Sequence, residues 1–275
     1  MMIDRHIELI ASESCTKIDW LRKALTCLDI NNVADWTHNQ VEKNGSIYSY
    51  NFKNVEYLMP PWPLMWCEYS GKNNPFWINL GNVGILTVVI DDKIVNTVFL
   101  EVKIDNKLDI VPGGTVSFFY DKITKSINKY GIVRVTPSYH SESELENRAN
   151  QSRISSCLFP VIFAIAFTHC KNVDVDKIEI SKKLQNSRIK RGKQPFFRFN
   201  TIIIDPMRNI IKTEGGAEMV GFKRALHICR GHFATYTDEH PLFGRVTGTF
   251  WKSMHLRGNK KEGVVIKDYK IEAPQ

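Results

Sequence analysis

The stretch Val83-Gly-Ile-Leu-Thr-Val-Val-Ile90, followed by Asp91-Asp92 and then by Lys93-Ile-Val-Asn-Thr-Val-Phe-Leu-Glu-Val102, indicates the fold class most clearly. Both long runs are rich in β-branched and aromatic residues, which favour strands, and the paired aspartates between them are typical of a tight turn. Shorter strand-like runs lie on either side, and Pro112-Gly113-Gly114 supplies another turn signal. These residues predict an antiparallel β-meander over 76–119.

Helices are expected on both sides of this meander. Apolar residues recur at helical spacing over 5–30, with Ser14 or Thr16 as a cap between two helices. Ser141 and Glu144 have the spacing of a capping box, which predicts a second helical region over 139–170. Its apolar run, 157–167, has 11 residues, fewer than the roughly 20 that span a bilayer, so we expect a buried helix that Pro160 kinks or restarts.

The remaining segments read mostly as strands. A proline elbow at 60–63 precedes a strand at 64–69, and later strands are expected at these positions: 173–180, 196–204, 227–236, 249–257 and 263–271. The sequence therefore predicts an α+β protein in three parts. These are an N-terminal α+β part (1–138) made of helices and the meander, a central buried helix (139–170), and a basic β-rich C-terminal part (171–275).

Composition favours a soluble, reduced protein. The 275 residues are 43% hydrophobic and 24% charged, which is ordinary for a globular protein. The six cysteines form no C-x-x-C pair, so neither a disulfide framework nor a paired-cysteine zinc site is expected. The first residues have an early acid and no apolar core of a signal peptide. We expect a cytoplasmic protein without a membrane partner.

Positive charge is concentrated in the C-terminal third. Residues 181–270 hold 19 Lys and Arg against 7 Asp and Glu, a net +12, whereas residues 1–180 hold 18 against 21, a net −3. Such asymmetry points to an anionic partner, of which nucleic acid is the commonest, although a solvated basic face is the alternative.

The densest basic segment is 181–198, which contains seven cations and no acid. A run of this kind repels itself and is usually extended or mobile until it meets an anion. Phe196 and Phe197 lie among the cations, and this mixture favours binding of RNA or single-stranded DNA by phosphate pairing and base stacking. The alternative is a solvated surface loop whose phenylalanines begin a core strand. The predicted nucleic-acid-binding residues are Lys182, Lys183, Arg188, Lys190, Arg191, Lys193 and Arg198.

A second candidate site gathers histidines and arginines near the C-terminus. Because strand side chains alternate between faces, Arg230, His232 and Tyr236 share one face of their strand, and His255 and Arg257 share one face of theirs. Metal-independent RNA cleavage needs a general base, a general acid and cations for the developing phosphorane charge, and the ordinary histidine pKa of about 6.5 suits both proton roles. His232 and His255 would be base and acid in either order.

In that scheme Arg230 and Arg257 would stabilise the phosphate, and Tyr236 or Ser253 would orient it. Structural histidines on strands are the alternative. Zinc is a competing interpretation for the same region, with possible ligands at His227, Cys229, His232, His240 and His255. An adjacent arginine and the opposite strand faces of Cys229 and His232 disfavour a zinc ion, so no metal or cofactor is predicted.

Four segments together resemble a group of uncharacterised proteins encoded by phages and other mobile elements. They are Pro-Pro-Trp-Pro-Leu-Met-Trp-Cys-Glu-Tyr (60–69), Lys-Leu-Gln…Lys-Arg-Gly-Lys-Gln-Pro-Phe (183–196), Arg-Gly-His-Phe (230–233) and His-Leu-Arg-Gly…Gly-Val-Val-Ile-Lys-Asp-Tyr (255–269). The resemblance implies a setting in phage biology, in the host-cell cytoplasm. It does not point to any particular activity. The histidines and arginines are also similar in kind to those of the small metal-independent ribonucleases of the barnase, EndoU and RelE type.

Three functions follow from these patterns. The first is a phage-associated nucleic-acid-binding protein that cleaves RNA without a metal through His232 and His255. The second is a non-catalytic protein that binds a nucleotide or inhibits a host complex with the same cationic residues. The third is a component of a phage assembly.

Overall fold

A computed structural model describes residues 1–44, 59–72, 74, 80–104, 107–119, 134–138, 143–178, 180–204, 225–229, 232–252, 255–257 and 259–264. For residues 39–44, 134, 204, 225–229, 255–257 and 259–264 it describes the backbone alone. Among these residues, five helices and a large mixed sheet of eight strands make an α+β protein, as the sequence predicts.

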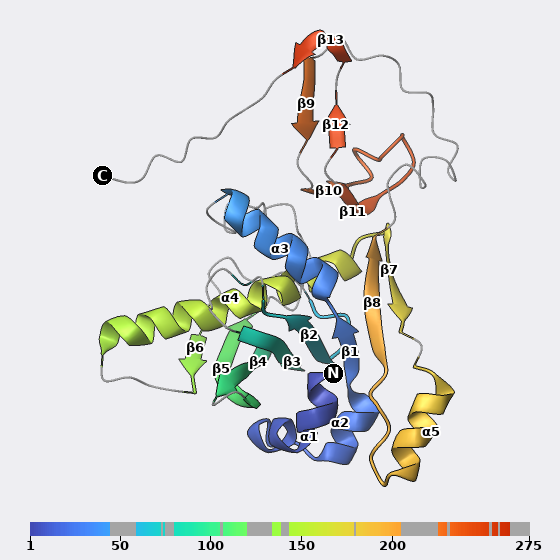
Figure 1. Cartoon of the computed structure of the whole chain (residues 1–275). Helices are drawn as coiled ribbons and strands as arrows, with labels where there is room; N and C mark the ends of the chain where they lie inside the picture. The colour runs from blue at the N-terminus through green and yellow to red at the C-terminus, as the bar shows by residue number, and fades with distance from the viewer. Residues whose placement is uncertain are drawn as a thin grey trace.

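The eight-stranded sheet has the order β6-β5-β4-β3-β2-β1-β8-β7 (Figure 1). Its strands are β1 (Thr26–Asp29), β2 (Leu64–Ser70), β3 (Leu80–Ile90), β4 (Lys93–Ile104), β5 (Lys107–Phe119), β6 (Arg134–Pro137), β7 (Val173–Lys177) and β8 (Phe199–Ile204). Strands β2 to β6 pair antiparallel with their neighbours in sequence, which confirms the predicted meander over the described residues. β1 lies parallel to both β2 and β8, and β7 forms the far edge, antiparallel to β8.

The turn expected at Pro112-Gly113-Gly114 is wrong, because these residues lie inside β5. The register between β4 and β5 shifts between Val98 and Phe99, opposite this segment, which marks a β-bulge. Gly114 has a φ of +139°, and a Cβ there would lie 2.5 Å from the carbonyl oxygen of Thr136 on β6. The glycines therefore permit an irregular strand and a close backbone approach.

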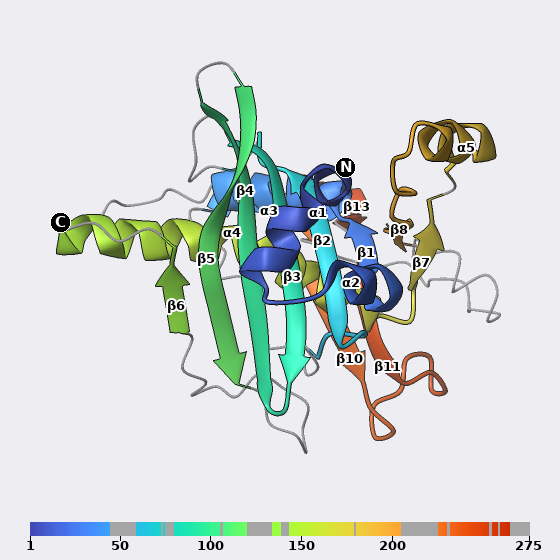
Figure 2. The same cartoon turned by 90° about the horizontal axis from the view of Figure 1, so that it is seen from below.

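Helices cover both faces of the sheet (Figures 1 and 2). On one face lie α1 (Met2–Glu13) and α2 (Ile18–Ala24), and on the other lie α3 (Asn31–Asn44) and α4 (Glu144–Thr168). Each pair of helices buries its own apolar cluster against the sheet. The fifth helix, α5 (Lys182–Lys190), projects at the periphery between β7 and β8 and has no buried residue.

Helix was predicted over the whole of 5–30, and this is wrong for its last residues, which form β1. Cys27 and Leu28 are both fully buried, but they belong to the two different apolar clusters, on opposite faces of the sheet. A strand buried on both faces carries a continuous apolar run, which periodicity alone does not separate from a buried helix. The expected break between two helices is confirmed at residues 14–17.

Helix α4 is the predicted central buried helix, and residues 157–167 pack in the core. Its cap is Ser143, whose Oγ accepts a hydrogen bond from the Glu146 amide, while the predicted cap Ser141 lies outside the described residues. Pro160 lies inside this one continuous helix. Among the described residues α4 alone is long and apolar enough to cross a membrane, and 61% of its most apolar window is buried, as in the core helix of a soluble protein.

The predicted C-terminal strands are confirmed by two smaller sheets, which lie above α3 and β8 in Figure 1. One is the hairpin of β10 (His232–Tyr236) and β11 (Gly248–Lys252). The other joins β9 (Ala225–Cys229) to β12 (His255–Arg257) and β13 (Asn259–Val264). β13 covers only the start of the strand expected at 263–271, and the rest of that segment lies outside the described residues.

The β10–β11 hairpin is fastened to the helical layer by aromatic rings. Phe233 and Trp251 face each other across the hairpin with ring centroids 4.8 Å apart, and the Trp251 ring lies 5.0 Å from both Trp36 of α3 and Phe167 of α4. The side chain of Asn172 donates to the Trp251 carbonyl and accepts from the Trp251 amide, each at 2.9 Å. These contacts attach the β10–β11 hairpin to the core of the main sheet.

The division expected at residue 171 does not correspond to a gap in the main sheet. β7 and β8 lie within the expected C-terminal part, yet β8 pairs with β1 and β7 pairs with β8. Residues 173–204 therefore extend the same sheet as the N-terminal strands, and α5 with its basic residues is an insertion between two strands of that sheet.

Candidate nucleic-acid interface

The first half of the basic segment is a capped helix, α5, where the charge of the segment predicts an extended or mobile run. Ser181 accepts a hydrogen bond from the Leu184 amide through its Oγ, which caps the N-terminus. At the other end Gly192 has a φ of +69°, its amide bonds to the Ile189 carbonyl, and the Lys193 amide bonds to the Arg188 carbonyl. This is a Schellman motif, so local capping overcomes the mutual repulsion of the cations.

Arg188 belongs to the structure of this segment. Its Nε donates to the Gln194 carbonyl at 2.6 Å, and its Nη2 donates to the Asp4 carbonyl of α1 at 3.2 Å. Its guanidinium carbon also lies 4.2 Å from the centroid of the Phe196 ring. Two of its five N–H donors therefore hold α5 against α1 and the following chain, and the role of Arg188 in binding nucleic acid stays a prediction.

The side chain of Asp4 also binds this segment. Its Oδ1 accepts a hydrogen bond from the Phe197 amide at 2.8 Å, and the side chain is 7% exposed. Burial raises the pKa of this carboxyl group, and the Phe197 amide and the nearby guanidiniums of Arg188 and Arg22 partly oppose the rise. Arg22 of α2 adds a bond from its Nη1 to the Pro195 carbonyl at 3.1 Å.

The two phenylalanines are already covered by protein cations. Phe197 is 6% exposed, lies in the apolar cluster beneath α1, and has the Arg22 guanidinium 4.6 Å from its ring centroid. Phe196 is half-buried beneath Arg188. Burial leaves no room for a base to stack on Phe197, which packs in the core two residues before β8 begins.

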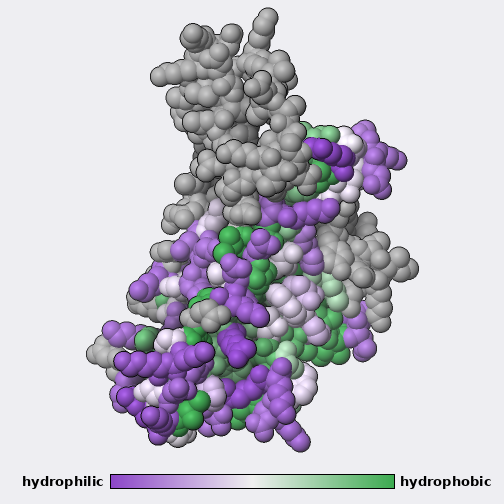
Figure 3. All heavy atoms as spheres, turned by 90° about the vertical axis from the view of Figure 1, so that its right-hand side faces the viewer, coloured by the Kyte–Doolittle hydropathy of each residue, from purple (hydrophilic) through white to green (hydrophobic). Residues whose placement is uncertain are grey.

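Six cations of the segment remain exposed, and we call them the α5 cationic surface: Lys182, Lys183, Lys190, Arg191, Lys193 and Arg198. Within the part of the chain that the structure describes, the ion pairs are Arg5 with Glu101 and Arg148 with Glu144, so none of the six is neutralised by a described carboxylate. Figure 3 looks onto the side of the molecule where α5 lies, and hydrophilic side chains gather over its lower part.

The histidine and arginine cluster is described only in part. His232, Tyr236 and Lys252 lie on the face of the β10–β11 hairpin opposite Phe233 and Trp251, with the Lys252 Nζ 5.1 Å from the Tyr236 ring centroid. His232 pairs directly across the hairpin with Lys252. Arg230 lies outside the described residues, and for His255 and Arg257 the backbone alone is described.

His232 and His255 lie in different sheets. β10, which begins at His232, pairs with β11, whereas β12, which begins at His255, pairs with β9. The residues that connect β9 to β10 and β11 to β12 lie outside the described ones, so joint catalysis by His232 and His255 stays a prediction.

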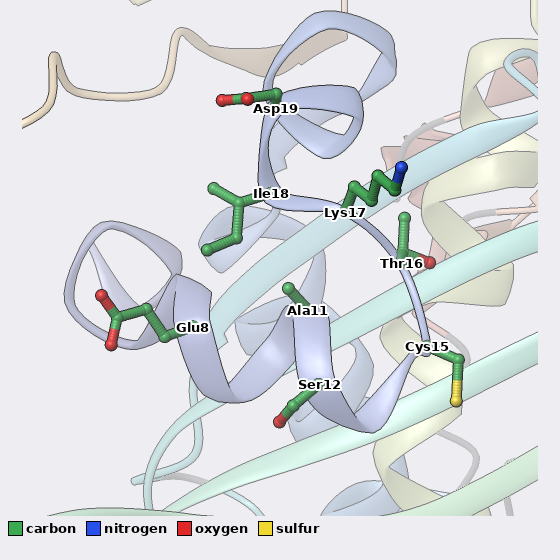
Figure 4. A pocket seen from close by; sticks show the side chains of 8 residues that line it. All are labelled: Glu8, Ala11, Ser12, Cys15, Thr16, Lys17, Ile18 and Asp19. Atoms are coloured by element: carbon green, nitrogen blue, oxygen red, sulfur yellow. The ribbon is translucent and has the colours of Figure 1, made fainter.

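Other possible chemistry finds little support among the described residues. They contain no group of three or more His, Cys, Asp or Glu side chains that could hold a metal ion. At the turn between α1 and α2 a shallow depression is lined by Glu8, Ala11, Ser12, Cys15, Thr16, Lys17, Ile18 and Asp19 (Figure 4). The side chains of Glu8 and Asp19 extend to one side of it and Lys17 to the other, so no set of charged groups converges there.

Comparison of the chain with protein-family models, curated proteins and solved structures gives no match. Its function is therefore argued from its own residues.

Sequence reasoning missed two features of the interface. Lys252, opposite His232, was not among the candidate residues, although antiparallel pairing of the two expected strands brings it there. The helix at 182–190 was also missed, although Ser181 before it and Gly192 after it are the cap residues that such a helix requires.

Proposed function

We propose that this protein binds nucleic acid through the α5 cationic surface. One observation carries the proposal: six exposed cations lie on the projecting helix α5 or in the eight residues that follow it, with no acid in the same 18-residue segment. Lysine and arginine side chains held this way bind phosphate oxygens, and they release counterions from the nucleic acid when they do. Arg188 is left out of this surface because it is partly buried and two of its N–H groups donate to backbone carbonyls.

The rigidity of the surface distinguishes it from a merely solvated basic loop. Caps fix both ends of α5, and Arg188, Arg22 and Asp4 fasten the chain that follows it to α1 and α2. A surface ordered before binding loses less conformational entropy on binding than a mobile loop. The cations are therefore already placed for an extended anion.

The proposal is tested by fluorescence anisotropy with labelled RNA and DNA oligonucleotides at low salt. The variant Lys182→Gln, Lys183→Gln, Lys190→Gln removes three charges from α5. The matched control, Lys72→Gln, Lys103→Gln, Lys107→Gln, removes three charges from exposed lysines elsewhere. We expect the first variant to bind much more weakly than the control. Equal affinity of the two variants would reject the α5 cationic surface as the binding site.

Cleavage of RNA stays a separate proposal. It rests on residue types in β10 and β12, which belong to different sheets. Labelled RNA incubated with the protein in EDTA would show cleavage that the His232→Ala, His255→Ala double variant lacks; cleavage unchanged in that variant would remove these residues from the mechanism. The phage setting, the host-cell cytoplasm and inhibition of a host complex remain proposals that rest on the sequence.

A further inference from the structure

The outward face of α5 carries its lysines in a narrow arc. At about 100° per residue, Lys182, Asn186, Lys190 and Lys183 fall within about 100° of one another around the helix axis. All four are exposed, while Gln185, Ser187 and Arg188 are the partly buried residues of the helix. Lys182 and Lys190 are separated by about 12 Å along the axis, from a rise of 1.5 Å per residue.

Helix α5 has no aromatic residue, and neither aromatic ring of the chain that follows it is fully exposed. Phe197 is in the core, and the Phe196 ring is covered by the Arg188 guanidinium at 4.2 Å. The exposed apolar residues of α5 are Leu184 and Ile189, which are aliphatic. Proteins that hold single strands without sequence preference combine a cationic groove with aromatic rings on which bases stack, at about 1–3 kcal/mol per base. The α5 cationic surface has the cations and lacks the rings.

We infer that the ligand of this surface is a nucleic-acid duplex, bound through its phosphates without readout of base identity. This inference rests on the proposed function. A duplex presents phosphates at fixed positions and at a high charge density, with about one charge per 1.7 Å in B-DNA. A capped helix presents its lysines at fixed backbone positions to such an array, whereas a flexible strand would have to be ordered without stacking to offset the entropy.

The preference has an expected size. For each tenfold rise in salt concentration, the association constant falls by about 0.9 log units per phosphate contact for B-DNA and by about 0.7 for single strands. The contribution of counterion release vanishes at the reference concentration of about 1 M salt. For about six phosphate contacts at about 0.15 M salt, the difference between the two slopes therefore makes a duplex bind about tenfold more tightly than a strand of the same length.

The experiment compares four labelled probes of one sequence: single-stranded RNA, single-stranded DNA, duplex RNA and duplex DNA. A second, unrelated sequence is run in parallel, and all affinities are measured by anisotropy with the full chain. We expect at least one duplex to bind about tenfold more tightly than either single strand, with less than threefold difference between the two sequences. The two duplex arms show whether the helix is DNA or RNA.

Two outcomes overturn the inference in distinguishable ways. Single strands that bind as tightly as the duplexes, with loss of binding in the Lys182→Gln, Lys183→Gln, Lys190→Gln variant, would leave the proposed function standing and refute the duplex preference. No binding to any probe would refute both. A Phe196→Leu variant adds a direct test of stacking: we expect unchanged affinity, and a tenfold loss of single-strand binding would show that this ring stacks on bases.

Discussion

Arg188 and Arg191 lie three residues apart and are predicted to respond oppositely to truncation. In Arg188→Ala the protein loses the hydrogen bonds to the Gln194 and Asp4 carbonyls, at 2.6 and 3.2 Å, and the contact with the Phe196 ring. Bonds from a charged donor are worth about 1.5–3 kcal/mol each, and an exposed cation–π contact about 0.5–1 kcal/mol. Because Arg188 is partly exposed, solvent weakens these interactions, and we expect a total loss of about 2–4 kcal/mol of unfolding free energy.

The matched variant is Arg191→Ala, which removes an exposed arginine that belongs to the α5 cationic surface. Surface substitutions of this kind usually change stability by less than about 0.5 kcal/mol. We therefore expect Arg191→Ala to weaken nucleic-acid binding at unchanged stability, and Arg188→Ala to reduce stability. Urea titration followed by tryptophan fluorescence gives the unfolding free energies of both.

Arg188→Lys separates geometry from charge. A lysine keeps the positive charge but lacks the planar fork that reaches two carbonyls and covers a ring. We expect it to recover less than half of the loss seen in Arg188→Ala. Wild-type stability in Arg188→Ala, or full recovery in Arg188→Lys, would show that the described hydrogen bonds do not hold the segment.

Three further perturbations test the fold. Burial lowers the pKa of His38, so the unfolded chain binds the proton more readily and the free energy of unfolding falls as pH drops below about 6.5. In His38→Leu, the urea midpoint should therefore change less between pH 7 and pH 5 than it does in the wild type. Gly84→Ala should cost about 2–3 kcal/mol in the same titration, because its Cβ would lie 2.2 Å from Trp66 Cζ2. Asn172→Ala should cost about 2–5 kcal/mol and speed amide exchange at Trp251, whose N–H and C=O lose their partner.

The meander could be predicted because its residues carry their own signals. The runs on either side of Asp91-Asp92 are rich in β-branched residues and pair with their sequence neighbours, so the local pattern and the tertiary pairing agree. Cys27 and Leu28 carried no such signal. Pairing with β2 and β8 places β1 inside the sheet, and its two faces are buried under the helices on either side, α1 with α2 and α3 with α4.

The candidate site was predictable in its charges and not in its geometry. Composition located the cations of 181–198. Arg188 differs from the neighbouring cations because it donates a hydrogen bond to the carbonyl of Asp4, which lies 184 residues away in the sequence. The alternation of side chains along a strand correctly placed His232 and Tyr236 on one face of β10. Which side chains of a neighbouring strand share that face depends on the register of the two strands, which alternation alone does not give. Register depends on the turn between strands, and Leu242 to Val246 forms an irregular connection that residue types do not specify.

The salt dependence of binding tests the central claim most directly. The logarithm of the association constant for a duplex, plotted against the logarithm of salt concentration, has a slope of about −0.9 per phosphate neutralised. The Lys182→Gln, Lys183→Gln, Lys190→Gln variant is predicted to reduce the magnitude of that slope by about 2.7, while the Lys72→Gln, Lys103→Gln, Lys107→Gln control leaves it unchanged. Equal slopes for the wild type and both variants would contradict the account, because the lysines of α5 would then contact no phosphate.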